Sequence, residues 1–287
     1  MTSRSLRIHR TSPSRRMRSA LSYAMLILVA IAVGLPVLWF LVSSFKTESE
    51  YVSYPIKLFP TVVQWKNYVF AVTYIAYWDY VGHSAYLAFA YSILCVLTSA
   101  MSGFAFARIR VPGRDALFAV VLAMLIVPGL VTTIPQFIVF SRVKLTNTYW
   151  PWILWGLAAA PFHIFLFRQF FTTIPEQLEE AAEVDGCTPY RIFWQIFLPN
   201  AKPVIATSFI FNFSGVWGDW FAPLIYLDNE HTTLAVKLTS GYANPAGLPL
   251  TMPTLSAAVI YTIPLIVLFF LGQKYIIQGV VTSGIKG

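Results

Sequence analysis

The stretch Val81–Ala107, VGHSAYLAFAYSILCVLTSAMSGFAFA, contains 27 residues and no Asp, Glu, Lys or Arg. An α-helix rises 1.5 Å per residue, so about 20 apolar residues cross the hydrocarbon core of a bilayer. Comparable runs follow at other places in the chain: Ser19–Phe45, Ala116–Ser141, Leu145–Phe167, Pro203–Leu227 with Asp219 as its one charge, and Met252–Gln273. The sequence therefore predicts an all-α integral membrane protein with six transmembrane helices.

The composition excludes other classes of protein. Hydrophobic residues make up 57% of the chain, charged residues 11%, and the mean hydropathy is +0.65. A soluble domain carries about 25% charged residues, because they cover its surface. A soluble globular enzyme and a disordered chain are thus excluded. The net charge of +8 comes from basic residues in the connections between apolar runs, which indicates contact with the membrane surface and not with nucleic acid.

Neither a metal site nor a catalytic centre is predicted. Cys95 lies in a predicted span and Cys187 in a polar connection, so a disulfide between them is not expected. His83 and His163 have no second ligand three or four residues away. The chain has no G-x-x-x-x-G-K-[ST] nucleotide loop and no nucleophile–base arrangement. We therefore expect no enzymatic activity and no cofactor bound by this chain itself.

The distribution of Lys and Arg predicts the orientation of the six helices. Fourteen of these residues flank one side of the predicted spans and six flank the other. The positive-inside rule places the richer side, with both termini, in the cytoplasm. The predicted organisation is a basic cytoplasmic tail over residues 1–18, a transmembrane domain over 19–277 and a cytoplasmic tail over 278–287. The first apolar run is longer than the 7–15 residues of a signal-peptide core, so it is expected to remain as an anchor.

The longest polar segment on the predicted cytoplasmic side, residues 173–199, lies between the fourth and fifth spans. Thr173 and Glu176 have the spacing of a capping box, and Gly186 stands where a left-handed C-cap belongs. A second helix is expected to start at Thr188 and to end at Pro199. The segment thus predicts a helix–turn–helix. Its expected apolar faces are Ile174, Leu178, Ala181 and Ala182 on the first helix, and Tyr190, Phe193, Ile196 and Phe197 on the second.

The first of these helices is acidic and carries small side chains, which allow close approach of a partner helix. The alternative is a helix that lies on lipid. Such helices are usually basic and carry large apolar residues, so docking to a protein is favoured.

The same segment carries a recognisable motif. Glu180-Ala181-Ala182 is followed after three residues by Gly186, and after nine more by Ile196-x-Leu198-Pro199. This pattern resembles the EAA loop of bacterial ABC importer permeases. The resemblance implies that the loop docks in a cleft of an ATP-binding subunit. It assigns docking to Glu179, Glu180, Ala181, Ala182, Asp185, Gly186, Ile196 and Pro199.

The resemblance extends over most of the chain and is greatest to carbohydrate permeases related to the shorter membrane subunit of maltose importers. It includes Phe104–Arg108 with Pro112–Arg114, the segment Leu145–Trp150, and Trp217, Asp219, Phe221 and Pro223–Ile225. Gly218 replaces the Asn that is usual beside Asp219. The glycine-rich end of the chain, from Gly279, is expected to be extended, with Gly284, Lys286 and Gly287 against the ATP-binding subunit.

The implied assembly lies in the bacterial cytoplasmic (inner) membrane. It contains a second homologous permease, two ATP-binding subunits that hold ATP and Mg, and an extracytoplasmic substrate-binding protein. Candidate residues of the substrate pathway are Asn212, Trp217, Asp219 and Trp220. Asp219 is the only acid within a predicted span, and either pathway lining or placement at the membrane interface would explain it.

Two other classes of function agree less well with the sequence. A self-contained secondary transporter or channel would need ion-coupling residues within the spans, where only Asp219 and two histidines are available. A membrane-embedded enzyme would need a catalytic cluster. An ATP-driven importer that works by alternating access is therefore the favoured function.

Overall fold

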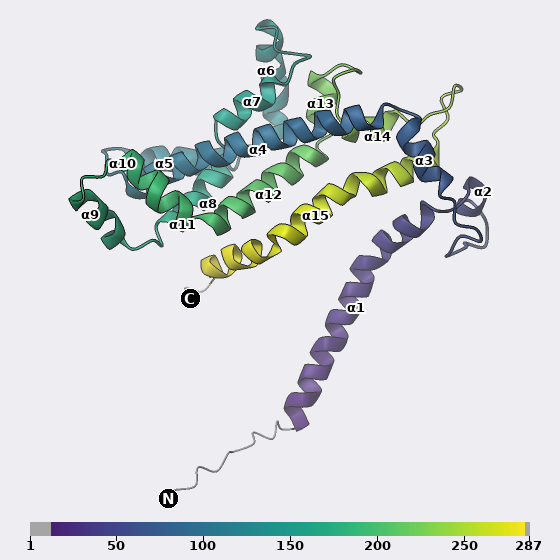
Figure 1. Ribbon diagram of the computed structural model, residues 1–287, viewed down its shortest axis with the longest axis horizontal. Helices are drawn as coiled ribbons and strands as arrows, with labels where there is room; N and C mark the ends of the chain where they lie inside the picture. Colours follow the sequence, from purple (N-terminus) through teal and green to yellow (C-terminus); the bar gives the residue numbers. More distant parts are fainter. Residues whose placement is uncertain (1–12, 285–287) are drawn as a thin grey trace, which may run out of the picture. The chain divides into compact units, whose positions relative to one another are not determined.

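The computed structural model describes the backbone of residues 13–284, and the elements of this part of the chain are helical (Figure 1). They are α1 (Pro13–Ser43), α2 (Glu48–Tyr51), α3 (Lys66–Thr73), α4 (Tyr77–Arg108), α5 (Arg114–Met124), α6 (Gly129–Arg142), α7 (Trp150–Leu157), α8 (Pro161–Phe171), α9 (Glu176–Val184), α10 (Pro189–Ile192), the π-helix η1 (Phe193–Phe197), α11 (Leu198–Asn200), α12 (Lys202–Gly218), α13 (Phe221–Tyr226), α14 (Leu234–Ser240) and α15 (Thr251–Gly284).

Membrane-spanning length is reached by four helical segments of the described chain, namely Leu21–Ser43, Tyr77–Arg108, Trp150–Phe171 and Thr251–Tyr275. They coincide with the first, second, fourth and sixth predicted spans. The bent pair α5 and α6 would be a fifth. The predicted fifth span is occupied by α12, which has 17 residues and is followed by the short α13.

Two of the predicted spans are broken at proline. The third divides into α5 and α6, which enclose an angle of 98°. Pro128 stands at the N-terminus of α6, where its extended backbone (ψ 125°) cannot continue a helix. In the fourth, Ala159 has a left-handed φ of 59° and Pro161 begins α8. Pro128 and Pro161 therefore lie at breaks in the helices, whereas Pro135, which also interrupts the apolar pattern, lies inside α6.

The chain divides into two units. The larger comprises residues 71–250 and 260–287, and α4 is its central helix. α4 packs against α7, α8 and α12 (Figure 1). Gly103 lets α8 approach closely, because a Cβ added there would lie 2.5 Å from the Cβ of Phe167. Thr98 on α4 donates a hydrogen bond of 2.8 Å to the carbonyl of Gly156 on α7.

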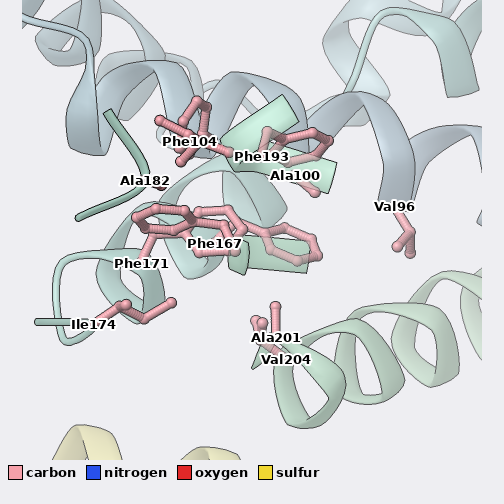
Figure 2. Packing of buried hydrophobic residues seen from close by; sticks show 12 residues of the cluster. Val96, Ala100, Phe104, Phe167, Phe171, Ile174, Ala182, Phe193, Ala201 and Val204 are labelled. Atoms are coloured by element: carbon pink, nitrogen blue, oxygen red, sulfur yellow. The ribbon is translucent and has the colours of Figure 1, made fainter. Parts of the chain in front are cut away.

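A cluster of aromatic side chains fills one end of this unit (Figure 2). It joins α4, α8, η1 and the start of α12, and includes one residue of α9, Ala182. Its buried aromatic members are Phe104, Phe167, Phe171, Phe193 and Phe197. The Phe104 and Phe197 rings meet edge to face at 4.9 Å, a geometry that aromatic pairs prefer. The polar loop packs against this aromatic cluster through Ala182.

The smaller unit comprises residues 1–70 and 251–259. Within it, the segment after α1 is bound back to the helix end. Asn67 donates hydrogen bonds to the carbonyls of Ser44 (3.0 Å) and Lys46 (2.9 Å). Ser256, near the start of α15, donates one of 3.1 Å to the carbonyl of Ser44.

Two connections differ from simple expectations. In the predicted outer loop, residues 241–250 form a tight turn around Gly247, with an isolated bridge between Ala243 and Pro249. At the other end of the chain, α15 continues as far as Gly284. The expectation of an extended tail from Gly279 is thus wrong up to Gly284, since the apolar helix before it simply propagates. Lys286 and Gly287 lie outside the described residues.

Candidate functional site

The polar loop begins with α9, whose start differs from the predicted capping box. Pro175 occupies the N-cap position and no side chain caps the helix. The hydroxyl of Thr173 instead donates a hydrogen bond of 2.7 Å to the carbonyl of Phe170 in α8. The capping-box prediction is wrong because Thr173 completes the preceding helix. Glu176 and Glu179 still lie in the first turn, where carboxylates favour the helix dipole.

The two sides of α9 have different surroundings. Ala182 is buried in the aromatic cluster, whereas Glu180, Ala181 and Glu183 are exposed. The predicted apolar stripe is thus only half correct. Ile174 and Ala182 face the core, but Leu178 is exposed with Ala181. The exposed side of α9 therefore carries acidic and small residues.

The end of α9 is a Schellman motif centred on Gly186. Gly186 has a left-handed φ of 77°, as predicted. Its N–H donates to the carbonyl of Glu183 (2.9 Å), and the N–H of Cys187 donates to that of Ala182 (2.9 Å). A Cβ at Gly186 would meet no atom within 4 Å. Glycine is required here by the backbone and not by lack of space. Asp185, at the C-cap, is exposed.

The second helical segment starts where expected and ends later. The Thr188 hydroxyl accepts a hydrogen bond of 3.4 Å from the N–H of Arg191. The helix then widens into η1 and continues to Asn200, so it does not end at Pro199. The Leu198 N–H donates to the carbonyl of Phe193, five residues back. The wider turn accommodates the proline that follows, whose nitrogen cannot donate.

The buried face of this segment agrees only in part with the predicted one. Phe193 and Phe197 are buried as predicted and Ile196 is half-buried, whereas Tyr190 is exposed. Ile192, which is not part of the predicted face, is buried as well. Pro199 is exposed next to the start of α12.

Arg108, at the C-terminal end of α4, holds the loop in place. Its Nη2 donates hydrogen bonds to the carbonyls of Phe171 (2.7 Å) and Ile174. Its Nη1 lies 3.5 Å from Oε2 of Glu179 on α9, and its guanidinium lies 4.9 Å from the centre of the Phe197 ring. The side chain is only 6% exposed. One residue thus connects the end of α4 to α8, α9 and η1.

Glu179 accordingly has an intramolecular partner. Its side chain is 20% exposed. Burial raises the pKa of this carboxyl above its ordinary value, and Arg108 opposes part of that rise. The carboxylate of Glu179 is therefore directed at its own chain, while that of Glu180 is free of contacts with Arg108.

A groove of about 380 Å³ runs between the end of α4 and α9. Its charged lining consists of Arg108, Arg110, Glu176, Glu179, Glu180 and Glu183. Four carboxylates thus face two guanidinium groups. Arg110 and Glu176 form an ion pair of 3.4 Å that is largely exposed, so it contributes little stability. The surplus negative charge suits a basic side chain from a partner.

The candidate pathway residues are not placed alike. Asn212 and Trp217 are buried within the larger unit. The Trp217 ring stacks on Phe213 and on Tyr261, and its indole N–H donates to the carbonyl of Tyr261 (3.1 Å). Trp220 is exposed. The structure thus leaves the Trp220 ring, and not the Trp217 ring, open to a ligand.

Asp219 has a role that neither sequence-based alternative includes. Its Oδ1 accepts hydrogen bonds from the N–H groups of Phe221 (2.9 Å) and Ala222 (3.2 Å). These are the first donors of α13, which have no partner within that helix. The carboxylate therefore stabilises the break between α12 and α13.

Comparison with known proteins identifies the family. Residues 96–282 match the family described as "Binding-protein-dependent transport system inner membrane component". The chain is 30% identical over 282 residues to the arabinooligosaccharides transport system permease protein AraQ of Halalkalibacterium halodurans, which covers 97% of this chain and 99% of the relative. The chain belongs to this family of transport permeases.

Other permeases are similar over nearly the whole length. The diacetylchitobiose uptake system permease protein NgcG of Streptomyces coelicolor is 33% identical, with 94% of this chain and 90% of that protein covered. A solved structure described as a bacterial ABC transporter involved in the import of the acidic polysaccharide alginate has a chain with a TM-score of 0.77 and 21% identity. The alignment covers 93% of this permease and 99% of that chain. This likeness shows the fold.

Sequence reasoning missed two features of this permease. In the sequence Arg108 stands only in the Phe104–Arg108 pattern, because the partners on α8 and α9 that define its role lie more than 60 residues away. The sequence likewise gives no partner for His163, which lies 3.0 Å from the hydroxyl of Ser208. An arginine that follows a long apolar run without other charges is a signal that could have drawn attention to Arg108. Within the described residues no group of three metal-ligating side chains occurs.

Proposed function

We propose that this permease is one membrane-spanning subunit of an ATP-driven importer for a sugar or oligosaccharide in the cytoplasmic membrane of a bacterium. The observation that carries the proposal is the exposed acidic side of α9, held against the end of α4 by Arg108. The names of the relatives, which include arabinooligosaccharide, diacetylchitobiose and lactose systems, support the substrate class.

The proposed membrane arrangement has six spans: α1, α4, α5 with α6, α7 with α8, α12 with α13, and α15. Both termini and α9 lie in the cytoplasm. The excess of Lys and Arg on that side supports the orientation. A cysteine at Glu183, in a chain without Cys95 and Cys187, tests it. It should be labelled by an impermeant reagent only after the cells are opened, and labelling of intact cells would reverse the orientation.

The proposed partner of the loop is an ATP-binding subunit, which holds ATP and Mg. Glu180, Ala181, Asp185 and Gly186 would form the docking side, and the groove beside them would receive a basic side chain. Glu179, Ala182, Ile196 and Pro199 would hold the loop in shape, because the first two face their own chain. Two such subunits, a second homologous permease and an extracytoplasmic binding protein complete the assembly.

The proposed mechanism is alternating access. ATP-driven closure of the two subunits would displace α9. Arg108 would transmit that displacement to α4, which packs against α7, α8 and α12. A rigid connection is needed, because a loop free to move would absorb the displacement without changing the spans.

The test is co-purification with the ATP-binding subunit together with transport in vesicles. Glu180→Lys would place like charge against a basic cleft. It should release that subunit, or leave ATP hydrolysis without transport. Glu230→Lys, an exposed substitution on the predicted outer side, is the matched control. Normal transport and normal binding by Glu180→Lys would refute the docking role.

The remaining site proposals concern the chain end and the pathway. The end of the chain, with Gly284, Lys286 and Gly287, is proposed to contact the ATP-binding subunit. Deleting residues 283–287 should lower transport more than assembly. Among the pathway candidates, the exposed Trp220 is proposed to stack on a sugar ring, with Asp219 positioning it. Asn212 and Trp217 would line the path only if the helices around them separate during transport.

A further inference from the structure

The segment Tyr51–Trp65, here called the outer segment, has an unusual distribution of polarity. Its large apolar side chains are exposed: Tyr54 at 96%, Phe59 at 73% and Ile56 at 66%. Val52, Leu58, Val62 and Trp65 are exposed as well. A loop in water keeps such side chains inside or does without them.

Two charged groups beside this segment, those of Lys46 and Glu50, are bonded within the chain instead. Lys46 is fully buried. Its ammonium group donates to the carbonyl of Lys57 (2.7 Å) and lies 3.8 Å from the centre of the Trp39 ring. Glu50 accepts hydrogen bonds from Thr61 and from the N–H of Thr47. The arrangement is the inverse of a solvated loop, and it suits an apolar surrounding.

These same bonds hold the outer segment next to the end of α1. The N–H of Gln64 donates to the carbonyl of Phe45 (3.0 Å), which closes the loop at its base. Lys46 and Glu50 fasten it at two further points. The segment cannot extend away from the helix end, so the position of that end decides where the segment lies.

The end of α1 lies at the boundary of the bilayer. The spanning part of α1, Leu21–Ser43, has 23 residues. This corresponds to a helix of about 35 Å, which is long enough to cross the hydrocarbon core of a bilayer. Three residues later the outer segment is fastened to Lys46. Its exposed side chains include two tyrosines and a tryptophan, the residues that membrane interfaces favour. Its one charged residue is Lys57, and it contains no carboxylate.

From this we propose that the outer segment Tyr51–Trp65 is inserted in the lipid interface beside α1 and anchors that end of the helix to the bilayer. Because Ser256 is bonded to the carbonyl of Ser44 within the same unit, the start of α15 is held at the same depth. The inference depends on α1 crossing the membrane, and on neither the orientation nor the transported substrate.

Spin labels can test this in the complete transporter reconstituted in nanodiscs of phosphatidylethanolamine and phosphatidylglycerol. Single cysteines would replace Ile56, Leu58 or Phe59 in a chain without Cys95 and Cys187. Leu28→Cys on α1 and Glu230→Cys in the loop after α13 are the lipid and water controls. Power-saturation spectra compare collisions with oxygen, which concentrates in lipid, and with a water-soluble nickel chelate.

The expected result is that oxygen collisions exceed those with the nickel chelate at all three positions, as at Leu28, with the opposite order at Glu230. Greater access for the nickel chelate would place the segment in water and overturn the proposal. So would nickel access that disappears only when the purified substrate-binding protein is added, because this would assign the surface to that protein.

Discussion

Replacing Arg108 by alanine should disconnect the polar loop from the spans. The change removes two hydrogen bonds, to the carbonyls of Phe171 and Ile174, and the ion pair with Glu179. Hydrogen bonds from a charged donor contribute about 1.5–3 kcal/mol each. Such contributions are not additive, so we expect a loss of about 3–4 kcal/mol in the local stability of α9. At 1.4 kcal/mol per factor of ten, 3 kcal/mol corresponds to a roughly 100-fold larger population of a displaced loop.

Arg108→Lys is the graded control. A lysine carries one ammonium group and cannot reach acceptors on α8 and α9 with a planar fork, so it should recover only part of the loss. Glu179→Gln removes the ion pair together with the buried negative charge and leaves both hydrogen bonds to the carbonyls, so its effect should be smaller than that of Arg108→Ala.

Two assays separate connection from folding. Amide hydrogen exchange in residues 176–187 reports the loop, with α12 as the internal reference. The number of substrate molecules moved per ATP hydrolysed, in vesicles with the complete transporter, reports coupling. Arg108→Ala should raise exchange in the loop and lower that ratio while the complex still assembles. Unchanged loop protection and an unchanged ratio would refute the role given to Arg108.

Four further changes test individual features. Gly186→Val places a β-branched residue at a φ of 77°, so it should destabilise the turn by about 1–2 kcal/mol and raise hydrogen exchange in the loop. Gly186→Asn should have a smaller effect. Equal protection from exchange in both variants would show that the turn tolerates any residue. Ala181→Leu should weaken binding of the ATP-binding subunit without changing the thermal stability of the permease, because Ala181 is exposed. A loss of thermal stability would instead indicate that Ala181 is packed in the core. Because the pKa of Glu179 is raised, the folded loop binds this proton more tightly than the unfolded loop does. Protection of the loop from hydrogen exchange should therefore be greater below that pKa and fall as the pH rises through it. Glu179→Gln should remove this dependence of hydrogen exchange on pH. Asp219→Asn keeps an oxygen that can accept from the first N–H groups of α13, so this variant should transport. Asp219→Ala should lose about 1 kcal/mol of stability at the start of α13 and transport less. An equal loss of transport in both variants would favour a direct role of the charge in the pathway.

Much of the local architecture can be predicted from the sequence, because it depends on residues close together in the chain. The uncharged run Val81–Ala107 lies within α4, and Gly186 adopts the left-handed conformation expected of a C-cap. Pro128 and Pro161 mark the breaks in two spans. Hydropathy, backbone preference and the missing N–H of proline act at the residue that carries them.

Other predictions failed because a residue has more than one local option and distant contacts choose between them. Thr173 can cap α9 or complete α8, and it completes α8. Leu178 and Ala181 have the spacing of a core stripe, but the aromatic cluster packs against Ala182 and leaves them exposed. In the second helix Phe193 and Phe197 are buried as predicted, but no described part of the chain covers Tyr190, which is exposed.

The sequence by itself determined that this chain is a helical membrane protein whose polar loop has the residue spacing of an EAA motif, because apolar length and motif spacing are properties of the chain alone. Only the tertiary structure decided which side of α9 is free, that Glu179 is paired within the chain and that Asp219 caps α13. These outcomes depend on atoms brought together from distant positions, as when Arg108 meets the carbonyls of residues 171 and 174. No periodicity along the chain encodes such a meeting, since it arises only when α4 and α8 pack at the distance that Gly103 permits.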